Sequence, residues 1–595
     1  MGLLQQACKT YDCHNRLIGI YREGTKAVLA PVGHITAKIN VEITVDSKGN
    51  YISGRKVPQE EPRRIIPATI ESMGRTSAPC AHPLCDQIVY IAAYNDVKRS
   101  KYLEQLETWT KSDYSHPLVN AVYHYVIGNT ILDDLSKDEL VKLNEDGTPS
   151  DEKMMIGWAL LDNTGKSIKC WQDADLMKKY TDYYINSLCE EKQLCMLSGD
   201  IECVTSSHLK GAVPLFGNAK FISANDTSNF TYLGRFLDDT QAVSVGYVHS
   251  QKAHNALKWL VENQGIIKGG RVFLCWNPEG RKIPPIISPL LVNNEVRLEP
   301  SDYKKSLENI INGYKGQKIS GTESVVIASF DAATTGRLSV TDYNEINISD
   351  FMSRLEKWDE YCSFYDGRFG MFSPSLGQII RAAYGVEREE RGIRKLVVDD
   401  KVVALQLQKL IMAKVENAKF PDDIRKNLVN RANNLSLYDI GNRNRVLHTT
   451  CSVIRKCVFE KTKEVIEMQV EPEKHDRSYQ YGRLLAILEK AESDTYQENE
   501  KGIRETNAIK MQSVFSKRPQ NTSRILIEQI KNAYYPRLKA SSRVYYEKLI
   551  GEIFEVLSSF PEGEQNKALA DNYLMGYYLQ KNELYSSRKN NQEEE

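Results

Sequence analysis

The stretch Tyr481-Gly482-Arg483-Leu484-Leu485-Ala486-Ile487-Leu488-Glu489 indicates how the last part of this 595-residue chain folds. Its large apolar side chains recur at the i, i+3, i+4 and i+7 spacing of one helical face, and so do Leu549, Ile553 and Leu557 farther along. Pro472 precedes the pattern and marks a boundary. We therefore expect a helix at Ser478–Ala491 and a C-terminal helical bundle over residues 471–595.

Outward from this stretch, strand patterns are rare in residues 346–470 and become common toward the N-terminus. Ile39–Val45 alternates apolar and polar residues, as a half-buried strand does, and Ala27–Val32 is a second expected strand. A turn follows at Asp46–Asn50. Residues 96–200 look mainly helical, with a strand-like insertion near Met155–Leu161.

Residues 201–345 return to strand signals on either side of a helical pattern. We expect strands at Lys220–Ser223 and Ser324–Ala328 and a helix over Ser250–Asn263. The predicted fold class is α+β, with mixed strand and helix regions first and a mainly helical half ending in a bundle. Four regions are expected, at residues 1–190, 191–345, 346–470 and 471–595.

Net charge and cysteine spacing limit the kinds of protein that this chain can be. The 78 basic and 78 acidic residues cancel, so the chain lacks the positive surplus of most stand-alone DNA-binding proteins, although clustered cations or partner subunits can supply one. No apolar run reaches the ~18–20 residues of a membrane span, and the N-terminus does not resemble a signal peptide. The 12 cysteines lack the short paired spacing of a structural zinc site. We expect free thiols, no metal or cofactor, and a cytoplasmic protein.

Motifs of catalytic chemistry are missing from the sequence. It contains no His-Glu-x-x-His pair, no Gly-x-x-x-x-Gly-Lys-Ser/Thr phosphate loop and no Gly-x-Ser-x-Gly elbow. No residue can be named as nucleophile or general base, so we expect that the chain is not an enzyme.

Two loop-like segments combine cations with short polar residues. The first runs from Arg55 through Arg63 and Arg64 to Gly74-Arg75-Thr76-Ser77, where prolines and glycine favour loops that approach phosphate. The second runs from His208-Leu209-Lys210-Gly211 to Tyr232-Leu233-Gly234-Arg235, where glycines allow close backbone approach. For both, the alternative is an ordinary solvated surface loop.

A third basic segment lies in the C-terminal bundle. Cations at residues 524–548 alternate there with Tyr534, Tyr535, Tyr545 and Tyr546. A basic groove with aromatic side chains suits a single nucleic-acid strand. The alternative is an amphipathic helix pair whose tyrosines are packed.

Together these segments resemble the large subunit of the type I-C CRISPR interference (Cascade) complex, the Dvulg-subtype large-subunit family. The matching stretches, in the family's order, are Arg75-Thr76-Ser77 with Leu84-Cys85-Asp86; Cys195-Met196-Leu197-Ser198-Gly199 with His208-Leu209-Lys210-Gly211 and Ile222-Ser223-Ala224-Asn225; Ala333-Thr334-Thr335-Gly336-Arg337-Leu338; Tyr481-Gly482-Arg483; and Gly576-Tyr577-Tyr578-Leu579-Gln580. Their order covers some 500 residues.

The resemblance implies a non-catalytic role within an RNA-guided assembly. Such a subunit reads the motif that flanks the target in double-stranded DNA, aids duplex opening, holds the displaced strand and presents the target to a helicase-nuclease. Its implied partners are the backbone and guide-processing subunits, the crRNA and target DNA. The expected DNA-binding residues are Arg63, Arg64, Arg75, Thr76, Ser77, His208, Lys210, Asn218, Lys220, Ser223, Asn225, Arg235, Arg524, Lys531, Arg537, Lys539 and Arg543.

The resemblance also implies a small subunit translated from an internal start. Met468 lies just before the Pro472 boundary, and a start there gives a 128-residue helical product (residues 468–595), whereas Met511 would discard the Tyr481–Leu488 face. Two rival hypotheses remain open: a metal-dependent nuclease with an unfamiliar carboxylate site, and a purely structural scaffold.

Overall fold

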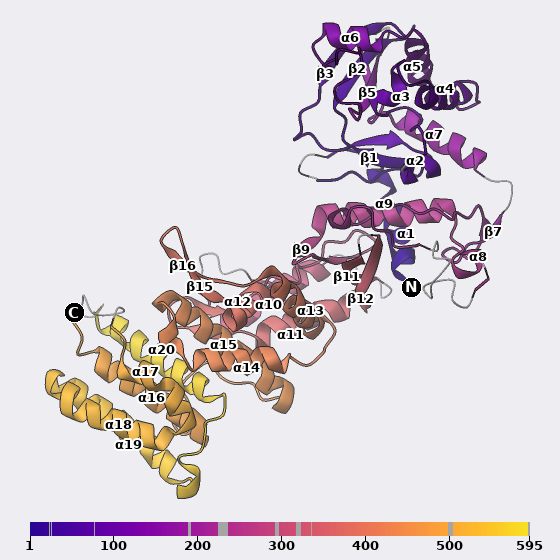
Figure 1. Cartoon of the computed structure of the whole chain (residues 1–595). Helices are drawn as coiled ribbons and strands as arrows, with labels where there is room; N and C mark the ends of the chain where they lie inside the picture. The colour runs from indigo at the N-terminus through magenta and orange to yellow at the C-terminus, as the bar shows by residue number, and fades with distance from the viewer. Residues whose placement is uncertain are drawn as a thin grey trace. The chain divides into compact units, whose positions relative to one another are not determined.

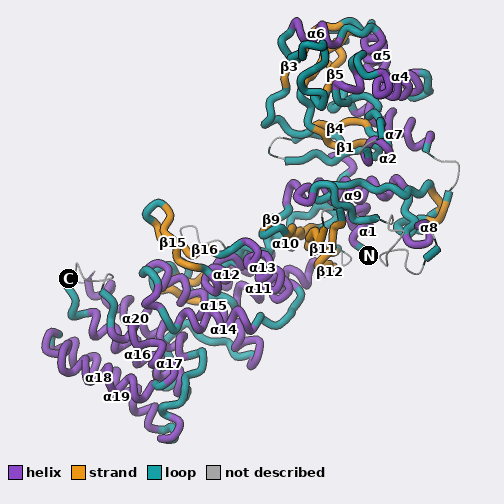
Figure 2. The backbone as a smooth tube through the Cα atoms, viewed as in Figure 1, coloured by secondary structure: helices purple, strands orange, loops and turns teal. Residues whose placement is uncertain are grey.

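The computed structural model describes the chain in two compact units. Unit 1 comprises Met1–Arg281 and Ser324–Glu345, and unit 2 comprises Lys282–Glu323 and Ile346–Glu595 (Figure 1). Not described are residues 23, 25, 76–77, 163, 189–191, 224–235, 238, 292–296, 317–322, 335, 498–503 and 593–595. Figure 2 shows strands in the first unit and a predominance of helices in the second, which confirms the expected α+β class. The division into four regions stays a prediction.

The N-terminal part of unit 1 is built on a four-stranded sheet of order β3-β2-β5-β6. Its strands are β2 (Val41–Asp46), β3 (Tyr51–Lys56), β5 (Ile156–Leu161) and β6 (Ser167–Lys169). β2 and β5 are parallel, with Val41 opposite Ile156, and Val41, Ile43 and Val45 are buried as their alternation predicts. The strands expected at 39–45 and 155–161 are therefore confirmed.

The same part of unit 1 contains several helices, of which the one at Pro117–Ile127 packs against β2 and β5, and a separate two-stranded ladder. The helices are α2 (Ile70–Gly74), α3 (Ile88–Ile91), α4 (Asp96–Thr110), α5 (Pro117–Ile127), α6 (Ile131–Lys137) and α7 (Ala174–Ser187), and the ladder is β1 (His34–Ala37) with β4 (Arg64–Pro67). Trp158 and Tyr102 both donate to the Leu84 carbonyl, at 2.9 and 2.6 Å. These two buried hydrogen bonds fix the loop after residue 80 against the sheet.

The second part of unit 1 is an antiparallel sheet of order β12-β11-β10-β9. Its strands are β9 (Ile266–Lys268), β10 (Arg271–Trp276), β11 (Ser324–Thr334) and β12 (Arg337–Asn347), and α1 (Leu3–Cys13) packs with α9 (Tyr247–Gln264) beside them (Figure 1). The short elements β7 (Gln193–Leu194), β8 (Ile201–Glu202) and α8 (Asp239–Ala242) precede α9. The expected strand at 324–328 and helix at 250–263 are confirmed.

Unit 2 is mainly helical. Its helices are α10 (Pro300–Lys315), α11 (Ile348–Tyr361), α12 (Leu376–Tyr384), α13 (Asp400–Val415), α14 (Asp422–Ala432), α15 (Ile440–Thr462), α16 (Arg477–Ser493), α17 (Asn507–Lys517), α18 (Pro519–Gln529), α19 (Ala540–Ser558) and α20 (Tyr573–Gln592). Two hairpins interrupt them, β13 (Phe364–Asp366) with β14 (Gly370–Phe372), and β15 (Val386–Glu390) with β16 (Ile393–Val397). The helix expected at 478–491 is α16.

Two glycines allow α16 and α20 to cross in close contact. A Cβ atom on Gly482 would lie 1.9 Å from the Tyr573 carbonyl oxygen, and one on Gly576 would lie 2.3 Å from that of Tyr479. Beside this crossing the buried Arg483 guanidinium donates from Nε to Gln580, at 2.9 Å. The two C-terminal sequence signatures are thus the two sides of one helix–helix contact.

Several expectations are wrong. Ala27–Val32 is loop with a single bridge, Ile18 to Leu29, and Lys220–Ser223 makes only isolated bridges, because each segment pairs through one residue rather than a ladder. Ten cysteines are free, as expected, but Cys203 is disulfide-bonded. No helix within the described residues is long and apolar enough to cross a membrane.

Candidate nucleic-acid interface

Three cationic residues occupy neighbouring backbone segments of unit 1. Lys210 pairs antiparallel with Lys220 through an isolated bridge, and Lys220 pairs parallel with Arg337 at the start of β12. The Lys220 amide donates to Gly336, at 3.2 Å, and the Lys220 carbonyl accepts from Leu338, at 3.1 Å. Gly211 and Gly217, both at positive φ, turn the loop that brings the two lysines together. Two motifs more than 100 residues apart are therefore joined in one basic surface.

Among the described residues, neither Lys210 nor Lys220 forms an ion pair. Burial, and then the charge of Lys210, lower the pKa of Lys220. A phosphate placed between the two lysines would relieve this repulsion, which is why such a pair is suited to an anionic backbone.

A small cavity extends the basic surface toward the first sheet. It has a volume of about 130 Å³, and Thr36, Lys210, His254 and Lys258 are among its lining residues. Lys258 Nζ donates to Thr36 Oγ1 at 2.8 Å, and Arg63 Nη2 donates to the Thr36 carbonyl, also at 2.8 Å. Arg63 and Lys210, expected in separate DNA-binding segments, therefore approach the same cavity.

The lining of this cavity carries side chains of both charge signs, Lys210 and Lys258 with Glu262. Burial lowers the pKa of Lys258 to about 8, and burial raises the pKa of Glu262, the carboxylate in the described lining. We refer to Arg63, Lys210, Lys220, Lys258 and Arg337 together as the basic cluster.

The histidine of the second segment lies beneath the basic cluster. His208 is 6% exposed and stacks on His254, with ring centroids 6.0 Å apart. Its Nδ1 forms a hydrogen bond with Ser250 Oγ at 2.8 Å. Burial, with the nearby His254 and Lys220, lowers the pKa of His208 to about 3. The neutral, buried ring supports the surface above it, and its expected DNA contact stays a prediction.

Two arginines of the first segment already have partners within the protein. Arg75 forms a bidentate ion pair with Asp86, at 2.7 and 2.6 Å, and lies 4.6 Å from the Tyr90 ring centroid. Arg64 pairs with Glu61 and lies over the rings of Tyr21 and Trp171. Both anchor loops, so their guanidinium groups reach DNA only if these pairs open.

The remaining residues of the first two segments divide by what the structure describes. Asn218 is exposed and Ser223 is half-buried. Thr76, Ser77, Asn225 and Arg235 lie outside the described residues, and their assignment stays a prediction.

These observations bear on one comparison with known proteins. The family model of the CRISPR-associated protein Cas_Csd1 matches residues 15–585 of this chain. The chain belongs to the Cas_Csd1 family. No curated protein sequence matches it.

The third segment of this Cas_Csd1 chain presents cations but few aromatic faces. Its cations are exposed along α18, the turns that follow it and α19: Arg524, Lys531, Arg537, Lys539 and Arg543. Tyr534, Tyr535 and Tyr546 are buried, whereas Tyr545 is 46% exposed. The expected aromatic platform is therefore reduced to one tyrosine, since the other three pack as the amphipathic alternative supposed.

Two members of the basic cluster were missed by sequence reasoning. Arg337 lies in one of the family-like stretches but is not among the expected DNA-binding residues, because only the fold places it beside Lys220. Lys258 follows Ser250 and His254 at four-residue spacing on α9, and this one-faced pattern is the signal that could have found it.

Proposed function

We propose that this Cas_Csd1-family chain is the large, non-catalytic subunit of a type I-C RNA-guided surveillance complex in the cytoplasm. It recognises the motif flanking the target in double-stranded DNA, aids duplex opening, holds the displaced strand and presents the target to a helicase-nuclease. Its partners are the backbone and guide-processing subunits and the crRNA. Family membership and the order of the sequence signatures support this proposal.

One observation carries the DNA-binding part. Lys210 and Lys220 form no ion pair among the described residues, although the whole chain is electrically neutral. A neutral protein that leaves cations together in one place is suited to a local anionic ligand such as a DNA backbone.

Charge reversal tests this part. We expect Lys210→Glu with Lys220→Glu to weaken target binding by the assembled complex and to lower the slope of log K against log salt by about 1.8, or roughly 0.9 per lost phosphate contact. Lys142→Glu with Lys153→Glu is the matched control, because both lysines are exposed and the net charge changes equally. Unchanged affinity and slope in the first variant would support the scaffold hypothesis instead.

The nuclease hypothesis is tested directly. Purified chain incubated with target DNA and Mg²⁺ or Mn²⁺ should leave the DNA intact. Cleavage that survives further purification and is lost with EDTA would establish the rival function.

The C-terminal bundle also supports a separate small subunit started at Met468. In the full chain, α20 packs against α15, and Tyr578 donates to Asp366 while Cys451 Sγ donates to the Leu574 carbonyl, at 3.4 Å. A product beginning at Met468 lacks α15, so the face of α20 around Leu574 and Tyr578 becomes available to another subunit. We therefore expect the small subunit to be stable mainly within the complex.

A further inference from the structure

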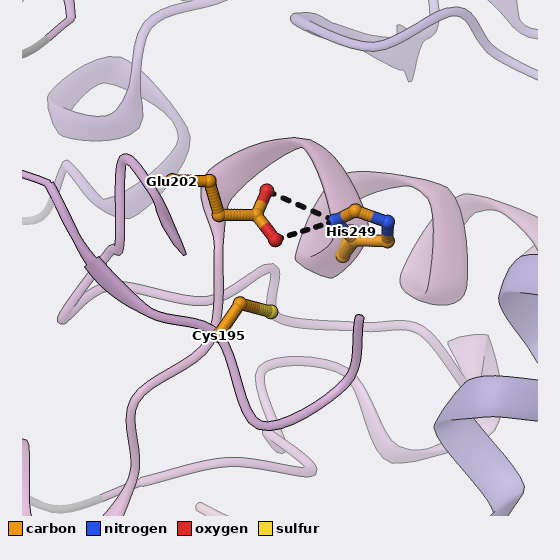
Figure 3. Close-up of side chains that lie close together, drawn as sticks. All are labelled: Cys195, Glu202 and His249. Carbon is orange, nitrogen blue, oxygen red and sulfur yellow. Dashed lines mark hydrogen bonds and ion pairs between the residues drawn. The ribbon is translucent and has the colours of Figure 1, made fainter. Parts of the chain in front are cut away.

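Three potential metal ligands converge in unit 1 at the beginning of α9. They are Cys195, immediately after β7, Glu202 at the end of β8, and His249 in the first turn of α9 (Figure 3). One donor atom from each, the Cys195 Sγ, a Glu202 carboxylate oxygen and a His249 ring nitrogen, all lie within 4.8 Å of one another. Cys195 is completely buried and the other two are half-buried, so the cluster has an accessible side.

A tight hairpin holds Cys195 and Glu202 in place. The Cys195 amide donates to the Asp200 carbonyl at 2.8 Å, and the Gly199 amide donates back to Cys195 at 2.9 Å. Gly199 has a φ of +82°, which a side chain would strain. Such a Cys-x-x-Ser-Gly turn presents its sulfur and the Ser198 hydroxyl on the same short loop.

The α9 terminus supplies the third ligand and supports the other two. The Gly246 amide donates to Cys195 Sγ at 3.2 Å, which fixes the position of the sulfur. His249 Nδ1 lies 2.9 Å from the Glu202 carboxylate, and Ser198 Oγ donates to the same carboxylate at 2.6 Å. A cysteine sulfur, an imidazole and an oriented carboxylate form a donor set typical of zinc.

We propose that Cys195, Glu202 and His249 bind one divalent cation of the zinc class, with a water molecule as fourth ligand. Tetrahedral zinc at its usual bond lengths separates its ligand atoms by about 3.3–3.8 Å, and the three donor atoms lie within 4.8 Å of one another. Cys203 is disulfide-bonded and is not in the ligand set.

Gly246 explains why the carboxylate can occupy this place. A Cβ at Gly246 would lie 2.1 Å from Glu202 Cδ and 2.2 Å from Oε2. The backbone angles of Gly246, φ −59° and ψ 141°, suit any residue, so the glycine is needed for space and not for conformation. Gly246→Ala therefore displaces a ligand without removing one.

The metal would connect the hairpin to the helix that supports the basic cluster. His249 is followed on α9 by Ser250, His254 and Lys258, and Glu202 is followed by the loop that carries His208 and Lys210. A bound metal would thus join the hairpin to α9 at the root of this surface. The site does not depend on the proposed DNA-binding function.

Cobalt spectroscopy on the full-length chain tests the site. We expect chelator-treated protein to bind one equivalent of Co²⁺ with the d–d bands of a four-coordinate ion and a sulfur-to-cobalt charge-transfer band, and Zn²⁺ to displace it. Cys195→Ser should abolish the charge-transfer band, and Gly246→Ala should weaken Co²⁺ binding by about tenfold or more. Cys13→Ser, which removes an exposed thiol elsewhere, should change neither.

Two results would overturn the proposal. One is wild-type protein that binds no stoichiometric Co²⁺ or binds it without the sulfur band. The other is a sulfur band that persists in Cys195→Ser. Because the wild-type spectrum is itself decisive, a variant that fails to fold does not leave the question open.

Discussion

Replacing Gly482 with alanine should separate α16 from α20. The new Cβ would lie 1.9 Å from the Tyr573 carbonyl oxygen and 2.8 Å from the Tyr577 amide nitrogen. Ordinary contacts begin at 3.4 Å, so the helices must move apart by roughly 1.5 Å, because backbone atoms cannot rotate aside. That shift breaks the 2.9 Å bond between Arg483 and Gln580.

The cost follows from these two effects. Overpacking costs about 1–3 kcal/mol, and losing a buried hydrogen bond to a charged group costs about 1.5–3 kcal/mol. Alanine recovers about 1 kcal/mol through its helix propensity. We expect a net loss of about 3 kcal/mol in the local unfolding free energy of the α16–α20 pair.

Hydrogen–deuterium exchange with mass spectrometry measures this loss locally. Peptides from α16 and α20 should exchange about 100-fold faster in Gly482→Ala, since each 1.4 kcal/mol is a factor of ten. Gly551→Ala in α19 is the matched control, because its Cβ would meet no atom within 4 Å. Equal exchange in the two variants would refute the close crossing.

Other predictions concern pH and translation. Burial lowers the pKa of His208 to about 3 and that of His254 to about 4, from the ordinary 6.5. Unfolded chains therefore bind these protons first, and the free energy of unfolding should fall as pH drops from 6.5 to about 3. His208→Gln should reduce that slope in pH-dependent denaturation. The pKa of Lys258 is about 8, so its contribution to stability should rise between pH 8 and 10.5, and Lys258→Met should remove this rise. Met468→Leu should abolish the small subunit in immunoblots and weaken the complex while full-length protein remains; a small product with another N-terminus would contradict the start site.

Periodic stretches were predictable from sequence, because their large apolar side chains recur at the spacing of a strand or helix face. The strand at Ile39–Val45 and the helix at Ser478–Ala491 repeat apolar residues at the spacing that their core contacts require. Lys220–Ser223 looked like a strand, but its pairing stops at single bridges to Lys210 and Arg337. Such pairing depends on neighbours that are distant in sequence.

The sites were less predictable than the elements. The basic cluster joins residues from four segments, and sequence reasoning found Arg63, Lys210 and Lys220 without showing that they meet. The Cys195, Glu202 and His249 ligand set escaped a search for short cysteine pairs, because 47 residues separate Glu202 from His249. Arg75 was expected to contact DNA, but it pairs with Asp86, and no sequence pattern indicates that pair.

Recognition of the DNA next to an RNA-guided target, as proposed for this chain, is tested most directly by one binding measurement. The assembled complex is titrated with duplexes that share the target and differ only in the flanking base pairs, with and without the chain. We predict that affinity differs between flanking sequences by about tenfold or more with the chain present, since one base-edge contact contributes about 1–3 kcal/mol, and that Asn218→Ala reduces the difference. Equal affinity for every flanking sequence, or the same discrimination when the chain is omitted, would contradict the account.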